Sequence, residues 1–252
     1  MNYNLNNEIA SKNNKNVYRD GDKTIKLYVE NYSKANVLNE ALNQARVEEG
    51  TDLKIPKLIE VAKIGERWGI VSNYIEGKTL KTLMEENPEK LDEYLEMFVD
   101  IQLEVLDHEV PLLNRIKDKF KRKLTEAKNL DEATRFELLH RLSGMEDHNK
   151  LCHGDFNPAN IIVTNSGEHY IIDWAHVTQG NASADSARTF LIFSLHGREE
   201  IADKYLTLFS EKSGIPKTHI QRWIPIVAAT QLLKEDENHE MLNKWIDVVD
   251  YQ

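Results

Sequence analysis

The pattern of apolar residues changes near position 72, and this change limits the architectures that the chain can adopt. Before that point, short apolar runs alternate with turns: the stretches 17–19 and 24–29 are strand-like, and Asp20-Gly21-Asp22 between them predicts a hairpin. Two further runs, 55–61 and 68–72, are also strand-like. From position 78 onward, helical spacing prevails, over 90–106, 113–128 and 131–142 and again from about 183 to the end. The pattern predicts an α+β protein, with a small sheet followed by a larger helical part.

One helix is expected within the first part, over residues 36–49. Its apolar positions recur at helical spacing and Gly50 supplies a stop; they are Leu38, Ala41, Leu42 and Ala45. We therefore expect an N-terminal lobe at 1–72, a short hinge at 73–77 and a helical C-terminal lobe at 78–252.

The helical part is interrupted by a segment rich in polar side chains that can do chemistry. It runs His153-Gly154-Asp155-Phe156-Asn157-Pro158-Ala159-Asn160. Two strand-like runs follow, 160–163 and 169–172, with a turn between them, and Asp173 comes directly after the second. A hairpin here would bring Asn160 and Asp173 together at its open end.

Phosphoryl transfer from ATP needs few protein groups, and this segment contains suitable ones. Oxygen ligands hold Mg²⁺, a carboxylate orients the attacking hydroxyl, and a cation binds the phosphates. Mg²⁺ prefers hard oxygen donors, which Asn160 and Asp173 carry. Asp155, at the start of the loop, is then left to face a substrate.

His-Gly-Asp, four residues, Asn and then Ile-Asp-Trp resembles the catalytic signature of the aminoglycoside phosphotransferases and their choline- and homoserine-kinase-like relatives. The resemblance implies a two-lobed protein-kinase-like fold and Mg-dependent transfer of the γ-phosphate of ATP to a hydroxyl of a small molecule. It implies Asp155 as the catalytic base, with Asn160 and Asp173 as Mg²⁺ ligands. His153 would brace the loop.

The stretch 184–189 is similar to the next helix of that family, whose Asp usually hydrogen-bonds the backbone of the catalytic loop. Asp185 is therefore either such a support or a simple helix cap, because Asp is also a favoured capping residue.

The same family needs a strand lysine on the phosphates, paired with a helix glutamate. Lys26, between apolar Ile25 and Leu27, is the expected lysine, and the resemblance implies Glu40 as its partner. A helical wheel instead favours Glu48 or Glu49, which lie nearer the predicted apolar face, so the choice stays open.

The hinge and the N-terminal loop complete the nucleotide site that the resemblance implies. The Asn73 carbonyl and the Ile75 amide would bind the adenine edge. Phosphate-binding loops are often rich in glycine, but residues 9–16 contain none. Ser11 or Asn13 could donate to a phosphate there instead.

Composition excludes several other classes. The formal net charge is −10, which disfavours a nucleic-acid partner, and no apolar run approaches membrane length. The single cysteine, Cys152, permits no intrachain disulfide, and with no apolar signal segment we expect a cytoplasmic protein. Residues 73–252 hold 21 Lys/Arg and 32 Asp/Glu, so they carry the whole acidic excess. This excess either steers a cationic substrate or serves solubility.

Three alternatives remain beside a small-molecule kinase. A catalytically silent nucleotide-binding module is favoured only by the glycine-free loop. A protein kinase lacks support because Asp-Phe-Gly and Ala-Pro-Glu are absent and only residues 175–183 separate Asp173 from the next helix. A zinc hydrolase built on His148 and His153 is disfavoured by the oxygen-rich ligand set.

The acidic run 234–240 is either a solvated helix face or a site for a substrate amine.

Overall fold

The computed structural model describes residues 3–12, 14–195, 197–232 and 239–246. The chain forms two compact units. One, here called the sheet unit, comprises residues 1–88 and 158–176, and the other, the helical unit, comprises 89–157 and 177–252. Residues 78–88 and 158–176 thus group with the N-terminal sheet, whereas the sequence had placed them in the helical lobe. Backbone contacts join these segments to the sheet unit: Lys78 and Thr79 pair with Val163 and Ile162, and the Ile171 N–H donates to the Lys54 carbonyl at 3.0 Å.

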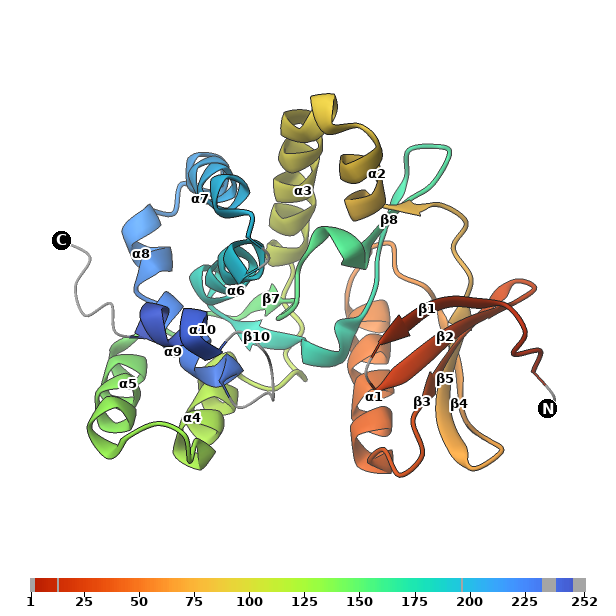
Figure 1. The fold of residues 1–252 in the computed structure, drawn as a ribbon, viewed down its shortest axis with the longest axis horizontal. Coiled ribbons are helices and arrows are strands. Elements are labelled where there is room, and N and C mark those ends of the chain that lie inside the picture. Colours follow the sequence, from red (N-terminus) through yellow and green to blue (C-terminus); the bar gives the residue numbers. More distant parts are fainter. Residues whose placement is uncertain (1–2, 13, 196, 233–238, 247–252) are drawn as a thin grey trace. The chain divides into compact units, whose positions relative to one another are not determined.

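The sheet unit is built on a five-stranded antiparallel sheet of order β1-β2-β3-β5-β4 (Figure 1). Its strands are β1 (Glu8–Lys12), β2 (Lys15–Asp20), β3 (Lys23–Tyr28), β4 (Leu58–Ile64) and β5 (Arg67–Asn73). The predicted hairpin is confirmed: β2 and β3 pair across a turn in which Gly21 takes a φ of 61°, which glycine adopts at little cost. The expected loop at 9–16 is wrong in part, because residues up to Lys12 form β1 and pair with β2.

Helix α1 (Lys34–Gly50) packs on β4 and β5, and the Ser33 hydroxyl caps its first turn. The predicted helix is confirmed, but its predicted apolar face is wrong in part, although Ala41 is buried as expected. Leu38 and Leu42 are exposed, and the buried face instead carries Val37, Glu40, Ala41, Asn43, Gln44 and Val47. The helix turns polar side chains inward because the sheet unit offers them partners; the Gln44 amide, for example, donates to the Pro56 carbonyl at 2.7 Å.

A smaller antiparallel sheet of order β6-β8-β9 completes this unit. It comprises β6 (Lys78–Thr79), β8 (Ile161–Val163) and β9 (His169–Ile171). Lys78 and Thr79 therefore belong to a strand and not to the helix expected from Lys78. That helix, α2 (Leu80–Glu86), begins where Thr79 Oγ1 accepts the Thr82 N–H at 3.1 Å.

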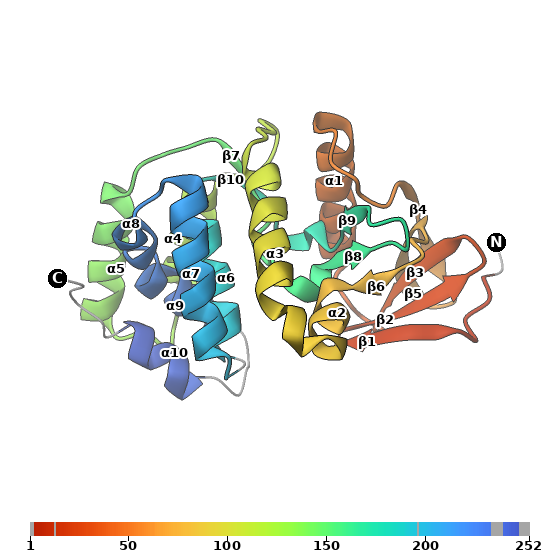
Figure 2. The same ribbon diagram turned by 90° about the horizontal axis from the view of Figure 1, so that it is seen from above.

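The helical unit contains three of the helices expected from the sequence, which are confirmed within a few residues: α3 (Leu91–Leu106), α4 (Ile116–Glu126) and α5 (Glu132–Gly144). After them come α6 (Ala182–Leu195), α7 (Glu199–Ser213), α8 (Lys217–Gln221), α9 (Ile224–Gln231) and α10 (His239–Ile246). A two-stranded ribbon, β7 (Lys150–Cys152) with β10 (Thr178–Gly180), was not expected. Helix α7 packs against both α3 and α6 (Figure 2). The core of the helical unit contains the rings of Phe98, Phe193 and Tyr205, which meet edge-on or tilted.

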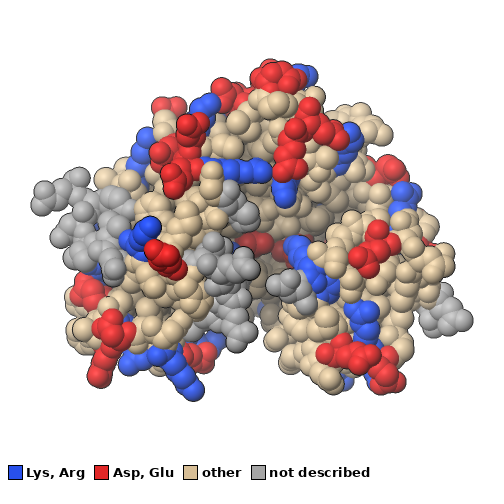
Figure 3. All heavy atoms as spheres, viewed as in Figure 1, with Lys and Arg blue, Asp and Glu red and all other residues tan. Residues whose placement is uncertain are grey.

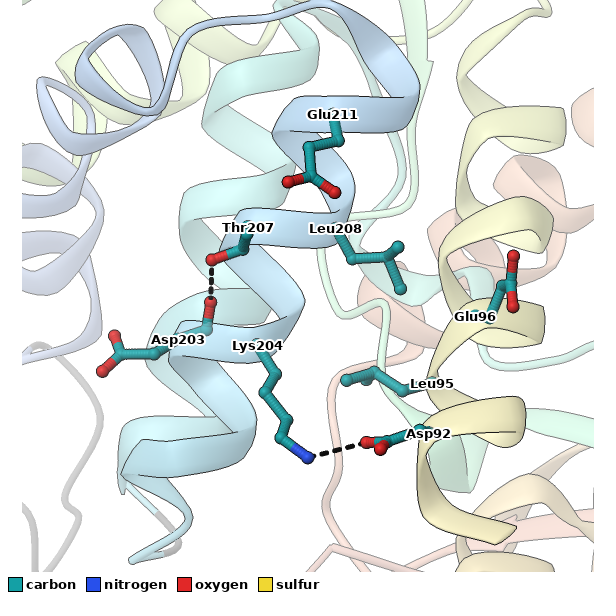
Figure 4. A pocket seen from close by; sticks show the side chains of 8 residues that line it. All are labelled: Asp92, Leu95, Glu96, Asp203, Lys204, Thr207, Leu208 and Glu211. Carbon is teal, nitrogen blue, oxygen red and sulfur yellow. Dashed lines mark hydrogen bonds and ion pairs between the residues drawn. The ribbon is translucent and has the colours of Figure 1, made fainter.

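Acidic and basic side chains are interspersed on the surface that Figure 3 shows. Within the described residues, no helix is long and apolar enough to cross a membrane. A surface groove runs between α3 and α7 (Figure 4). It is bounded by Asp92, Glu96, Asp203 and Glu211, and Lys204 already neutralises Asp92 at 2.7 Å. None of the site residues expected from the sequence lines it.

Candidate active site

The loop after β7 is held by its own side chains. His153 is fully buried, and its Nδ1 accepts the Asp155 backbone N–H at 3.3 Å. The His153 ring also meets the Phe156 ring edge-on at 5.8 Å between centroids. Gly154 takes a φ of 77°, in the left-handed region that favours glycine. These contacts agree with the expected bracing role of His153.

Asp155, the expected base, is partly buried and has two polar neighbours. Arg188 Nη2 lies 3.4 Å from Asp155 Oδ1, and Asn157 Nδ2 lies 3.4 Å from Oδ2 and 2.9 Å from the Asp155 carbonyl. Sequence reasoning missed Arg188, although it stands three residues after Asp185 and so shares that residue's face of α6.

Asp185 supports the loop and does not cap a helix. It lies inside α6 and is 1% exposed, and its Oδ1 accepts the Gly154 N–H at 2.7 Å. Burial raises the pKa of Asp185, against the opposing effect of the Gly154 hydrogen bond. The capping alternative is thereby excluded.

The hairpin after the loop is confirmed. β8 and β9 pair with Ile161 opposite Ile171, and the Ile172 N–H donates to the Asn160 carbonyl at 2.9 Å. Asn160 and Asp173 therefore lie at the same end of the hairpin. Asp173 has a φ of 69°, an uncommon value for a residue other than glycine. Such strained backbone is often found at functional sites.

A partly buried ion-pair cluster surrounds Asp173, and Lys26 is part of it. Lys26 Nζ lies 2.9 Å from Glu40 Oε1 and 3.2 Å from Asp173 Oδ1. The two other glutamates that the sequence left open lie elsewhere: Glu48 accepts the Leu58 N–H at 2.9 Å, and Glu49 is exposed. The structure thus brings together Lys26, Glu40 and Asp173.

Two further lysines join this cluster, and sequence reasoning missed both. Lys15, at the start of β2, is 6% exposed, and its Nζ lies 3.1 Å from Asp173 Oδ1 and 3.6 Å from Glu40 Oε1. Lys12, at the end of β1, reaches Asp173 Oδ2 at 2.9 Å. The β1–β2 hairpin brings two cations to the place where the sequence suggested a loop of small polar side chains.

Burial and charge act in opposite directions on this cluster. Burial alone would raise the pKa of Asp173 and of Glu40, but the attraction of Lys26 and Lys15 outweighs it and lowers both pKa values, that of Asp173 far below its usual range. Burial lowers the pKa of Lys15, helped by repulsion from Lys26. For Lys26 the two carboxylates outweigh burial and raise the pKa. Both carboxylates are therefore ionised at neutral pH.

The donor set suits a magnesium ion that is held together with a nucleotide. Among the described residues, no group of three or more His, Cys, Asp or Glu side chains could hold a metal ion. Asn160 and Asp173 offer one amide oxygen and one carboxylate, and Mg²⁺ commonly takes one or two carboxylates plus phosphate oxygens and water. The residues present thus fit Mg²⁺ with phosphate as a co-ligand.

The remaining expected residues lie in the sheet unit. Asn73 ends β5, and its N–H donates to the Lys57 carbonyl at 3.0 Å. Ile75 follows, lining a shallow pocket with Tyr74 and Tyr170. Ser11 lies in β1, and its hydroxyl accepts from Asn16 Nδ2 at 3.2 Å. Asn13 and positions 234–238 of the acidic run lie outside the described residues.

The sequence matches a family model described as the phosphotransferase enzyme family, over residues 10–219. No curated protein matches the sequence significantly.

Several solved structures resemble this one along most of its length. An aminoglycoside-3'-phosphotransferase of type VIII is 14% identical, with a TM-score of 0.65, over 91% of this chain and 93% of the other. A thermostable mutant of aminoglycoside phosphotransferase APH(4)-Ia, in a ternary complex with ADP and hygromycin B, is 10% identical, with a TM-score of 0.69, over 97% and 94%. An aminoglycoside phosphotransferase from Alicyclobacillus acidocaldarius is 12% identical, with a TM-score of 0.52, over 98% and 89%. These likenesses confirm the expected protein-kinase-like fold class.

Proposed function

Because the chain belongs to the phosphotransferase enzyme family, we propose that it transfers the γ-phosphate of ATP to a hydroxyl group of a small molecule. One observation carries this proposal: a largely buried lysine, Lys26, contacts both Glu40 and Asp173. A lysine fixed by a helix glutamate next to a metal-binding carboxylate is the arrangement that kinases use on ATP phosphates.

The sheet unit supplies the nucleotide-binding groups in this proposal. Lys26 and Lys15 would bind phosphate oxygens, and Glu40 would hold both ammonium groups in place. Lys15 does the work that backbone amides do in a glycine-rich loop, which explains how the chain manages without glycine at 9–16. The Asn73 carbonyl and the Ile75 amide would bind the adenine edge. Ser11 would donate to a phosphate from β1.

Asn160 and Asp173 would hold Mg²⁺, which when bound neutralises charge on the phosphates. Lys12, Lys15 and Lys26 contact Asp173 and compensate its charge. The same ammonium groups could also contact nucleotide phosphates, and an Asp173 oxygen would then bind the metal.

The helical unit contributes Asp155 as the base. Its carboxylate would accept a hydrogen bond from the substrate hydroxyl and orient the oxygen for in-line attack on the γ-phosphorus. General-base assistance of this kind is worth about 10²- to 10⁴-fold in rate. Asn157 and Arg188 would hold the carboxylate in its orientation.

The segment that follows Asp173 is better suited to a kinase of small hydroxylated molecules than to a protein kinase. Between Asp173 and the start of α6 at Ala182, the chain forms only one short turn, over 174–176, and strand β10. This segment is too short for the long activation segment that positions protein substrates. The similar APH(4)-Ia complex contains hygromycin B, an example of the substrate class that we propose.

A coupled ADP-release screen over hydroxylated metabolites and antibiotics, with wild type and Asp155→Asn in parallel, tests the proposal. We expect at least one alcohol to accelerate ADP release in the wild type, and the Asp155→Asn variant to lose about 10²-fold or more of that rate. ADP release that is equal in both proteins would contradict the role of Asp155. Slow hydrolysis of MgATP without any acceptor would still distinguish an enzyme from a silent module.

A further inference from the structure

Four buried side chains of the helical unit form one hydrogen-bond network. Gln102 comes from α3, Tyr205 from α7, and Asp185 and Thr189 from α6, and none is more than 1% exposed. The Tyr205 hydroxyl donates to Gln102 Oε1 at 2.7 Å. Gln102 Nε2 donates in turn to Asp185 Oδ2 at 3.4 Å and to Thr189 Oγ1 at 3.3 Å. Gln102 thus joins three helices.

The network ends on the backbone at both sides of Asp155. Asp185 Oδ1 accepts the Gly154 N–H at 2.7 Å, and Thr189 Oγ1 donates to the Phe156 carbonyl at 2.9 Å. The residues directly before and after Asp155 are therefore tied to two side chains that share a single partner, Gln102.

We propose that Gln102 is a positioning residue for Asp155, acting through Asp185 and Thr189. This inference rests on the proposed function, because it treats Asp155 as the base. Gln102 itself touches no reacting atom. It fixes the two side chains that anchor the loop, and so sets the direction in which the Asp155 carboxylate points.

The hydrogen bonds specify the type of residue at position 102. Tyr205 needs an acceptor, whereas Asp185 and Thr189 each need a donor, and a carboxamide offers both in one side chain. A glutamate in the same space would bring no donor and would place a second carboxylate against Asp185. A methionine would fill the volume but leave buried polar atoms without partners, which is costly in the protein interior.

Aromatic contacts also hold helix α3, which carries Gln102, in a fixed position against the loop that contains Asp155. Phe98, one turn earlier on α3, meets the Phe156 ring at 4.8 Å and the Tyr205 ring at 5.9 Å between centroids. At the surface, Lys204 forms an ion pair with Asp92 at 2.7 Å (Figure 4), and Lys212 forms one with Asp100 at 2.6 Å. Helices α3 and α7 are therefore also paired outside the core. The helix that carries Gln102 therefore has little freedom to rotate.

A loop shift of about 1 Å can cost about 10²-fold in rate even when every reacting group is present. Loss of Gln102 should therefore lower kcat. The KM for ATP should stay nearly constant, because the proposed nucleotide-binding groups belong to the sheet unit. A residue that served only general stability would not produce this split.

The test compares Gln102→Met and Thr189→Val with two matched proteins. Thr189→Ser keeps the hydroxyl that donates to Phe156, and Thr207→Val makes the same Thr-to-Val change on α7, where the hydroxyl donates to the Asp203 carbonyl and accepts from the exposed Lys217 Nζ, away from the Asp155 loop. For each folded variant we would measure kcat and KM for ATP, and the hydrogen-exchange rate of the Gly154 amide.

We expect Gln102→Met and Thr189→Val to lose about 10- to 100-fold in kcat, with KM for ATP within about twofold, and to exchange the Gly154 amide faster. Thr189→Ser should recover most of kcat, and Thr207→Val should match the wild type. Unchanged kcat in Gln102→Met and Thr189→Val, or an equal loss in Thr189→Ser, would overturn the proposal. If Gln102→Met does not fold, the kcat, the KM for ATP and the Gly154 exchange rate of Thr189→Val decide between the same outcomes.

The hydrogen-exchange rate of the Gly154 amide also distinguishes a failure of this inference from a failure of the proposed function. A wild type that phosphorylates no alcohol would refute the proposed function, whereas the Gly154 exchange rate would still report whether the network anchors the loop. Unchanged exchange in both network variants would overturn the inference alone.

Discussion

Lys15 Nζ lies 3.1 Å from Asp173 Oδ1, and the lysine is 6% exposed. A buried lysine on a strand next to a loop thus contacts the carboxylate that the catalytic signature assigns to metal binding. Together with Lys26 it places two ammonium groups beside Asp173 and Glu40.

Lys15→Met should weaken ATP binding about 10- to 100-fold, because a charge-assisted hydrogen bond contributes about 1.5–3 kcal/mol. Isothermal titration calorimetry with a non-hydrolysable ATP analogue would measure the change. Lys63→Met is the matched control, since Lys63 lies on the same sheet, is about half exposed and pairs with Glu66 at 2.8 Å. Equal affinities in Lys15→Met and the control would rule out a phosphate contact at Lys15.

The free energy of unfolding of Glu40→Gln should depend less on pH in the acidic range than that of the wild type. In the folded chain the pKa values of Glu40 and Asp173 are lowered, so these groups stay ionised where the unfolded chain is protonated. Their contribution is therefore full above about pH 4, the unfolded pKa, and is lost as the pH falls through the lower folded values.

The free energy of unfolding in urea, measured from pH 7 to pH 3, tests this expectation. Glu40→Gln should be about 3 kcal/mol less stable than wild type at pH 7, because it leaves buried lysines under-compensated, and the difference should shrink toward pH 3. Glu49→Gln, an exposed change on the same helix, should follow the wild type. A Glu40→Gln curve parallel to that of the wild type would contradict the expected linkage.

Magnesium should bind weakly to the nucleotide-free chain and at least about tenfold more tightly in the presence of ADP. The reason is the small donor set, with only Asn160 and Asp173 expected as protein ligands, and Asp173 contacted by lysines. Calorimetric titration of MgCl₂ with and without ADP gives both affinities, after correction for binding of Mg²⁺ to free ADP. Tight binding without nucleotide would show that the protein has a metal site of its own.

Local pattern and family resemblance together predicted much of the fold and part of the site. The β2–β3 hairpin followed from Asp20-Gly21-Asp22, and the β8–β9 hairpin from two short apolar runs around a turn. The family resemblance implied Glu40 as the partner of Lys26, although the helical wheel pointed to Glu48 or Glu49. The wheel failed because α1 exposes Leu38 and Leu42 and buries Glu40 against two lysines.

The missed residues depend on contacts between distant parts of the chain. The role of Lys15 could not be predicted, because residues 9–16 have no strand-like pattern. The lysine becomes buried when β1 pairs with β2. Gln102 and Asp185 are 83 residues apart, and nothing in the periodicity of α3 distinguishes an inward amide from an exposed one. Such positions become visible only when the helices are packed.

Calorimetric titration of MgATP into the wild type and into Lys26→Met tests the central claim most directly, since that claim is a nucleotide site built on Lys26, Glu40 and Asp173. We expect saturable binding to the wild type and at least about tenfold weaker binding to a folded Lys26→Met variant. Absence of binding to the wild type, or equal binding to both proteins, would contradict the claim.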